Sequence, residues 1–322
     1  IPTKPFKTVI MFANSSSDYF LSLTTLGLST TQVYPAFVFG TLTYLFIVFC
    51  NLLLIVTIAV SRKLHKPMFI LLFSLPVSDI MGATAFFPQF LLSIVLKTRL
   101  VSYPACVVQA FLVHLYGSAN LLTLTAMAYD RFVAICIPLR YNSIMNSHRL
   151  ITMVFLIWFV DLSMILTLLL LFTRFKICRK NIVDLYCNNP SLVKLVCEDT
   201  SVNNLYGIVL TLAFQGGTLL IILYTYAQIL RTCIMTNQAD ARRKAIQTCG
   251  THLVVFLFLQ INTVFTLISH RLQSVSPFLR RTFGVSVLIF PPILNPIIYG
   301  LKTNELKQNI IIFLKRNVGL TK

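Results

Sequence analysis

The chain has 322 residues, of which 57% are hydrophobic and 11% are charged, and its mean hydropathy is +0.81. A soluble domain of this size could not cover its surface with so few charges, so composition excludes a soluble globular protein and indicates one with several membrane spans. The net charge of +18 comes from Lys and Arg scattered through short gaps between long apolar runs. That distribution suits membrane lipid headgroups and an acidic cytosolic partner, and it argues against nucleic acid as a partner.

The N-terminal segment, residues 1–32, is polar and precedes the first apolar run. It contains Asn14-Ser15-Ser16, an acceptor for N-glycosylation if the segment faces the lumen. The apolar run from Val33 to Val60 is longer than the ~7 to 15 residues of a signal-peptide core, so we expect it to be the first span.

Apolar windows of about 20 residues, the length that a helix needs to cross the hydrocarbon layer, recur along the chain. They predict an all-α membrane protein in which a seven-transmembrane helix bundle occupies residues 33–301. No linker is long enough for a second soluble domain. The expected spans are Tyr34–Val60, Met68–Leu96, Tyr103–Cys136, Leu150–Phe172, Asn204–Leu230, Ala245–His270 and Thr282–Leu301.

The C-terminal tail, residues 302–322, carries apolar residues at helical spacing: Leu306, Ile310, Phe313 and Leu314. Lys and Arg flank this stripe, which predicts a short amphipathic helix lying on the inner leaflet. A soluble amphipathic tail is the alternative. The tail has no cysteine, which excludes palmitoyl anchoring there.

The distribution of basic residues favours an extracellular N-terminus. In that orientation the inner side holds 15 of the 27 Lys and Arg residues and the outer side holds 12. Five of those 12 lie in the long segment between spans four and five, and the rule discounts long segments. The comparison then becomes 15 against seven.

Four cysteines fall on the proposed outer side, where disulfides persist: Cys106, Cys178, Cys187 and Cys197. Four cysteines allow three pairings, and their spacing alone selects none of them. Cys136, Cys233 and Cys249 fall near the inner ends of spans and are expected to stay reduced.

Charged and amide side chains inside the apolar runs are candidates for function. Asp79 lies in span two, and Asn51, Asn120 and Asn295 of other spans are its candidate polar partners. The alternative is a protonated acid that is only hydrogen-bonded within the bundle. Asp130 and Arg131 form an adjacent charge pair, which must lie at a membrane edge because it is too costly at mid-bilayer.

Several of these residues together resemble a rhodopsin-like (class A) G-protein-coupled receptor: Asn51, Asp79, Cys106, Asp130-Arg131, Trp158 and Pro291 to Tyr299. Longer strings look like the vertebrate olfactory (odorant) receptors. These are Pro67-Met68-Phe69, Met127 to Cys136, Lys244-Ala245 with Thr248-Cys249 and His252-Leu253, and Pro292 to Tyr299. The resemblance covers all seven spans.

The resemblance implies a plasma-membrane receptor of olfactory sensory neurons, which binds a small-molecule odorant and activates a heterotrimeric stimulatory G protein that raises cAMP. It implies the disulfides Cys106–Cys187 and Cys178–Cys197, which would tether the long loop as a lid. It also implies a switch in which Arg131 leaves Asp130 on activation. A static surface pair is the alternative. The coupling residues would be Asp130, Arg131, Tyr226, Asn295, Pro296 and Tyr299.

The chain departs from the family pattern in span six, where Leu259-Gln260-Ile261 replaces the usual Phe-Tyr-Gly run and puts the usual aromatic switch in doubt. Asn120 stands where many members carry an acid or a serine. Asp79, Asn120 and Asn295 are therefore candidate ligands of a sodium ion, and no other cofactor is expected.

A ligand pocket is expected in the outer half of the bundle, because such pockets are mostly apolar with a few placed polar groups. A lone buried histidine is equally often a packing residue, and an arginine at the end of a span often extends to lipid headgroups. Arg271 would otherwise meet an acidic odorant. No metal site is expected, because His114 has no partner at ligand spacing. The candidate pocket residues are His114, Gly117, Ser118, Thr211, Phe214, Gln260, Thr263, Leu267 and Arg271.

Other classes of function fit the sequence less well. A transporter would show repeated halves with interrupted helices, and no such repeat is seen. An intramembrane enzyme would need clustered acids or a paired nucleophile and base, but the nine acids are dispersed, so the chain is not expected to be an enzyme. A class A receptor for a peptide or lipid mediator remains the main alternative.

Overall fold

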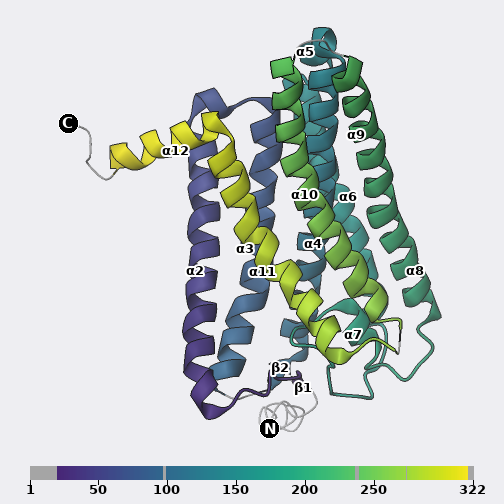
Figure 1. Cartoon of the computed structure of the whole chain (residues 1–322). Coiled ribbons are helices and arrows are strands. Elements are labelled where there is room, and N and C mark those ends of the chain that lie inside the picture. Colours follow the sequence, from purple (N-terminus) through teal and green to yellow (C-terminus); the bar gives the residue numbers. More distant parts are fainter. Residues whose placement is uncertain (1–19, 97–98, 236–238, 273, 318–322) are drawn as a thin grey trace, which may run out of the picture.

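The computed structural model describes residues 20–96, 99–235, 239–272 and 274–317 (Figure 1). Asn14, the predicted glycosylation site, lies outside the described residues. Seven described helical segments are long and apolar enough to cross a membrane, as predicted. They are α2 (Thr30–Val60), α3 (Pro67–Val95), α4 (Tyr103–Cys136), α6 (Ser147–Thr173), the run α8–η4–α9 (Ser201–Thr211, Leu212–Gly216, Gly217–Met235), α10 (Ala239–Ser269) and α11 (Pro277–Lys302).

Most of these helices extend beyond the predicted apolar windows. Helix α11 begins at Pro277 rather than Thr282, and α10 begins at Ala239 rather than Ala245. The hydropathy window ends where polar residues begin, but the helix continues because its backbone groups still need hydrogen-bond partners at the membrane edge. Proline at an N-terminal helical position, as in α3, α4 and α11, suits these starts because the missing N–H has no intrahelical partner.

Short elements close the two ends of the bundle (Figure 1). At one end, here called the α12 face, lie η2 (Arg62–Leu64), η3 (Pro138–Arg140), α5 (Tyr141–Ile144) and α12 (Asn304–Asn317). At the opposite end, the lid face, lie β1 (Phe20–Ser22), β2 (Leu100–Ser102) and α7 (Asn189–Val193). The amphipathic tail helix predicted from Leu306 and its neighbours corresponds to α12.

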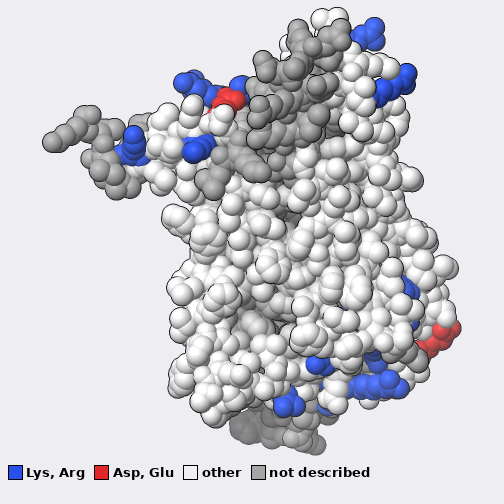
Figure 2. All heavy atoms as spheres, viewed as in Figure 1, with Lys and Arg blue, Asp and Glu red and all other residues white. Residues whose placement is uncertain are grey.

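The middle of the bundle is uncharged on the face that Figure 2 shows. Figure 2 shows Lys, Arg, Asp and Glu gathered towards the two ends of the face in view, with uncharged side chains between them. Large apolar side chains such as Phe39, Phe155 and Leu220 are exposed on the outer helices. This arrangement is what a lipid-facing surface requires.

Prolines in α11 leave backbone carbonyls of that helix without their usual hydrogen-bond donors. Side chains from other helices donate to two of these carbonyls. Pro296 has no N–H to donate to the carbonyl of Pro292, and Nδ2 of Asn51 donates to that oxygen at 2.9 Å. In the same way Pro291 cannot donate to the carbonyl of Val287, and the Tyr116 hydroxyl donates to it at 2.7 Å. Helices α2 and α4 therefore hold α11 at its weakest points.

The loop between α6 and α8 forms a fixed cover on the lid face. Disulfides join Cys106 to Cys187 and Cys178 to Cys197, the two pairings that the resemblance implied. The Gln109 side chain accepts a hydrogen bond from the Cys187 N–H at 2.7 Å, which adds a second link between the loop and α4. Strand β1 pairs with β2, and the N–H of Ile182 in the loop donates to the carbonyl of Ser22 in β1 at 2.8 Å.

Candidate functional site

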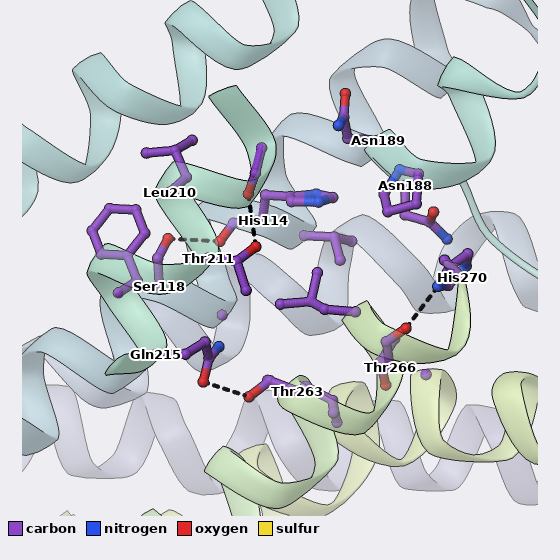
Figure 3. Close-up of a pocket in the computed structure, with 18 of the residues that line it drawn as sticks. His114, Ser118, Asn188, Asn189, Leu210, Thr211, Gln215, Thr263, Thr266 and His270 are labelled. Carbon is purple, nitrogen blue, oxygen red and sulfur yellow. Dashed lines mark hydrogen bonds between the residues drawn. The ribbon is translucent and has the colours of Figure 1, made fainter. Parts of the chain in front are cut away.

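A cavity of about 150 Å³ lies within the lid-face half of the bundle (Figure 3). Residues of α4, α6, α8, η4, α10 and α11 form its walls, and Tyr186, Asn188, Asn189 and Pro190 of the loop and α7 form its cover. Cavities of this volume in protein interiors take up molecules about the size of benzene. The apolar part of the lining consists of Val113, Leu121, Ile165, Leu168, Val287 and Leu288, among others.

Most of the predicted pocket residues meet in this one cavity. Their spacing on α4 and α10 places them on one helical face, and the bundle turns that face inwards. Gly117 is open towards the cavity, because a Cβ there would contact nothing within 4 Å. The predicted residues that line the cavity are His114, Gly117, Ser118, Thr211, Phe214, Thr263, Leu267 and Arg271.

Gln260 is the predicted pocket residue that lies outside the cavity lining. The chain forms a π-helical turn at η4, which widens the helix and leaves its carbonyl groups in need of other donors. The Gln260 amide donates to the carbonyl of Gln215 at 2.9 Å. The Gln215 side chain instead lines the cavity, where its oxygen accepts a hydrogen bond from the Thr263 hydroxyl at 3.3 Å (Figure 3).

The α4 wall presents two polar groups on successive turns. His114 Nδ1 lies 2.8 Å from the carbonyl oxygen of Ala110, which can only accept, so Nδ1 carries a proton. Ser118 Oγ lies 2.8 Å from the carbonyl oxygen of His114 and 2.5 Å from Oδ1 of Asp161. Asp161 belongs to α6, and its side chain is fully buried.

A buried cluster around Asp184 ties the cover to α10 and α11. Asp184 Oδ2 accepts hydrogen bonds from His270 Nε2 at 2.7 Å, from Asn188 Nδ2 at 3.0 Å and from the Ser191 hydroxyl, and its Oδ1 accepts one from Arg280 Nε at 3.1 Å. Burial alone would raise the pKa of Asp184. The hydrogen bond and charge of His270, together with the bonds from Ser191 and Asn188, outweigh burial and hold that pKa well below its usual range.

At the α12 face, Asp130 and Arg131 form an ion pair at the end of α4. Arg131 Nη2 lies 3.1 Å from Asp130 Oδ2, and the Tyr141 hydroxyl of α5 donates to Asp130 Oδ1 at 2.8 Å. Asp130 is completely buried, whereas 23% of the Arg131 side chain is exposed. The Arg131 contact is too poorly aligned to count as a hydrogen bond, so Tyr141 makes the better-directed bond to this carboxylate.

Beside this pair, three further side chains from different helices come together. The Tyr226 hydroxyl of α9 lies 2.6 Å from His252 Nδ1 of α10, and the centre of the His252 ring lies 6.5 Å from that of Tyr299 in α11. Tyr299 is buried, and its hydroxyl has no hydrogen-bond partner among the described residues. The predicted switch tyrosines therefore both lie beside one histidine, His252.

Between the two ends, Asp79 of α3 is the centre of a buried polar group. Asn295 Nδ2 donates to its Oδ2 at 2.8 Å, and Asn120 Nδ2 lies 3.4 Å from its Oδ1. The side-chain oxygens of Asn120 and Asn295 are buried and have no partner within the described part of the chain. The three residues predicted for a sodium site are thus in contact.

Comparison with known proteins identifies the family. The sequence model described as "Olfactory receptor" matches residues 40–317. The chain belongs to the olfactory receptor family. Human olfactory receptor 52B2 is 34% identical over 271 residues, 84% of each chain, and human olfactory receptor 52R1 is 31% identical over 307 residues, 94% of this chain and 97% of that one.

The fold of this olfactory receptor is similar to that of a rhodopsin. The crystal structure of squid rhodopsin matches it with a TM-score of 0.74 at 15% identity, over 94% of this chain and 92% of that chain. The predicted rhodopsin-like bundle and family are thereby confirmed. As a member of a receptor family the chain is not an enzyme, and it is a multi-pass protein of the plasma membrane.

Sequence reasoning missed several side chains at the receptor's pocket. Asp161 carried a usable signal, because an acid within an apolar run is a candidate for function. His270 was placed at the end of span six, but nothing local showed that Asp184 reaches it from 86 residues away. Gln215 was hidden by the π-turn, which shifts the helical periodicity on which pocket predictions depend.

Proposed function

We propose that this olfactory receptor binds a small odorant in the covered cavity, and that binding shifts the bundle to a state that activates a stimulatory G protein of the olfactory type and raises cAMP. The lid face is then extracellular and the α12 face cytosolic, in olfactory sensory neurons. The observation that carries the proposal is the cavity itself: about 150 Å³, covered by a loop that two disulfides fix.

The cover favours a small agonist over a peptide. A peptide needs an open groove, whereas Tyr186, Asn188 and Asn189 lie over this cavity. Cells that express the full chain would be exposed to volatile compounds and, separately, to peptides and lipid mediators, with cAMP as the readout. We expect volatiles alone to raise cAMP. A response to a peptide or a lipid mediator but to no small volatile would overturn the proposal.

The α12 face has the features of a coupling surface. Positive charge at this face raises the association rate of an acidic partner. It comes from η2, η3 and the first turns of α3 and α6: Arg62, Lys63, Lys66, Arg140 and Arg149. We assign the closed Asp130–Arg131 pair to the resting state. On activation Arg131 turns towards Tyr226 and Tyr299, and the unused Tyr299 hydroxyl becomes its acceptor.

Helix α12 is proposed to lie on the inner leaflet. Leu306 is buried against the bundle, and Ser61 Oγ donates to Asn309 Oδ1 at 2.8 Å, which fixes the helix against α2. Ile311, Ile312 and Leu314 remain exposed. Apolar residues left outside the protein contact are suited to the acyl chains of membrane lipid.

We also propose that a sodium ion binds at Asp79. The fit rests on the two unpartnered amide oxygens of Asn120 and Asn295: rotation of each amide would turn an oxygen towards a cation held by the carboxylate. Oxygen atoms are the ligands that hard cations prefer. Sodium should raise the unfolding temperature of the purified receptor more than potassium does, and Asp79→Asn should remove the difference. Equal effects of both ions would contradict this site.

A further inference from the structure

The contact between Ser118 and Asp161 fixes how the α4 wall of the pocket offers hydrogen bonds. Ser118 Oγ has three sites besides its Cβ: one proton and two lone pairs. Two of these sites are taken by Asp161 Oδ1 at 2.5 Å and by the carbonyl oxygen of His114 at 2.8 Å. Because Ser118 lines the cavity, its third site is the one left for a ligand.

Counting protons shows that the third site is an acceptor. The His114 carbonyl has no proton, and Ser118 has one, so two short oxygen contacts around Ser118 need a second proton from Asp161. In that arrangement Asp161 donates to Ser118 and Ser118 donates to His114. If Asp161 were ionised, the Ser118 proton would point at its carboxylate. In both arrangements a lone pair of Ser118 faces the cavity.

The surroundings of Asp161 favour the neutral acid. Its side chain is fully buried, its Oδ2 has no hydrogen-bond partner, and no ion pair to it occurs in the part of the chain that the structure describes. A buried carboxylate without a cation and with one oxygen unbonded costs far more than a buried carboxylic acid. Asp161 therefore keeps its proton and donates a hydrogen bond to Ser118.

Two neighbouring groups present the same polarity to a ligand. His114 Nδ1 carries the proton that faces Ala110, so in the neutral ring Nε2 is an acceptor, one helical turn from Ser118. Asn189 in the cover has a buried side-chain oxygen with no partner among the described residues. Buried acceptors without donors are costly, and a ligand that brings a donor removes that cost.

We propose that Asp161 is a neutral positioning residue that keeps Ser118 as a hydrogen-bond acceptor at the pocket wall, so that the receptor selects odorants that carry a hydroxyl group. The inference rests on the proposed function in one respect, because it takes this cavity as the odorant site. Arg271 is the competing polar group, since its guanidinium lines the cavity and would favour a carboxylate instead.

Matched compounds of about six to ten heavy atoms, the size that the cavity accepts, test the selection. Cyclohexanol and cyclohexanone, and benzyl alcohol and benzaldehyde, differ by a hydroxyl donor at nearly constant shape; cyclohexanecarboxylic acid tests Arg271. We expect each alcohol to raise cAMP at a concentration about tenfold lower than its carbonyl partner. Equal potency within the pairs, or a response to the acid alone, would overturn the selection.

Variants then assign the preference to the two residues. Ser118→Ala should reduce the preference for the alcohols, leaving only what His114 and Asn189 contribute. Asp161→Asn should keep the preference, because an amide N–H also donates to Ser118, whereas Asp161→Leu should reduce it. The control is Ser163→Ala, which changes an exposed serine on α6, the helix that carries Asp161, and should leave the preference unchanged. A preference that Ser118→Ala leaves unchanged would rule out Ser118 as the selecting acceptor.

The protonation of Asp161 can be measured without any agonist. Infrared spectra of the full chain in lipid nanodiscs should contain a C=O band of a buried carboxylic acid that disappears in Asp161→Asn. Ser118→Ala should shift this band, because it removes the oxygen that accepts the hydrogen bond from Asp161. This variant provides the test if Asp161→Asn does not fold. Asp79→Asn, at another buried acid of the bundle, should leave the band in place. If neither Asp161→Asn nor Ser118→Ala changed the carboxylic-acid C=O region of the spectrum, Asp161 would be ionised, whatever the odorant screen finds.

Discussion

The guanidinium of Arg131 lies 3.1 Å from the carboxylate of Asp130, and this carboxylate is completely buried while part of the arginine is exposed. The pair is therefore asymmetric: Arg131 has access to solvent and to an entering partner, and Asp130 does not. Arg131 Nε has no hydrogen-bond partner among the described residues. An arginine with spare donors beside Tyr226 and the buried Tyr299 is well placed to exchange one acceptor for another.

Removing the arginine tests its role in coupling. We predict that Arg131→Ala abolishes odorant-evoked cAMP while surface expression and odorant binding stay largely intact, because the side chain lies far from the cavity lining. Arg174→Ala removes an exposed arginine at the lid-face end of α6, outside the coupling surface, and is the matched control. Surface immunolabelling, radioligand binding and cAMP would be measured on the same cells. Signalling retained by Arg131→Ala would refute the switch.

Tyr141 is predicted to hold the resting state. Its hydroxyl donates at 2.8 Å to the buried Asp130, and a hydrogen bond of this kind contributes about 1 kcal/mol. Tyr141→Phe should therefore raise basal cAMP roughly fivefold if the closed pair is the resting form. Tyr129→Phe is the control, since the structure gives its hydroxyl no described partner. Unchanged or lower basal cAMP in Tyr141→Phe would contradict the assignment.

The cover should keep its stability in mild acid. Because the pKa of Asp184 is lowered in the folded state, its contribution is fully present above the unfolded value of about 3.9 and is lost only as pH falls through the lower folded value. Between about pH 5 and pH 7 the contribution of Asp184 should not change. Thermal unfolding of the wild type and Asp184→Asn across this range should show a constant difference.

The difference in stability between the wild type and Asp184→Asn should also be large. Asp184→Asn leaves His270 and Arg280 without their buried partner, which costs about 3 kcal/mol. Asp199→Asn, at an exposed acid in the same loop, should have little effect. A wild-type advantage over Asp184→Asn that disappears between pH 7 and pH 5 would show that the carboxylate titrates there and that its pKa is not lowered.

Gly82 is predicted to be irreplaceable for packing. A Cβ at this position would lie 2.4 Å from Cγ of Tyr116, whose ring cannot move without breaking its hydrogen bond to Val287 in α11. Gly82→Ala should destabilise the receptor by about 1 to 3 kcal/mol and reduce its surface expression. Gly250→Ala, in open space on α10, should be neutral. Equal expression of the two variants would contradict this role.

The sequence was sufficient for the fold because membrane crossing depends on local composition. A run of about 20 apolar residues indicates a membrane-spanning helix whatever its position in the chain. All seven spans were therefore predicted, and only their polar ends were missed. The α4 part of the pocket was also accessible. His114, Gly117 and Ser118 follow the helical repeat, and α4 is regular from Tyr103 to Cys136.

The remaining pocket features depend on contacts between distant segments. Asp184 meets His270 only after the loop has folded back under its disulfides, and the hydropathy of either segment gives no sign of this contact. Gln260 was predicted to line the cavity but donates to the carbonyl of Gln215 instead. Gln215 was not predicted to line it but does, because the π-turn changes which side chains of that segment face inwards. Long-range pairing and local irregularity are therefore the two limits of prediction here.

The π-turn at Leu212–Gly216 has a consequence for the length of this transmembrane segment. A π-turn is equivalent to one residue inserted into a regular helix, so everything after it is rotated relative to everything before it. The lid-face half of the segment supplies Thr211 and Phe214, and the other half supplies Tyr226. A one-residue deletion at Ala213 would restore regular winding, yet it would turn Tyr226 away from His252. Ligand contact and coupling in this segment are thus linked by a single residue of chain length.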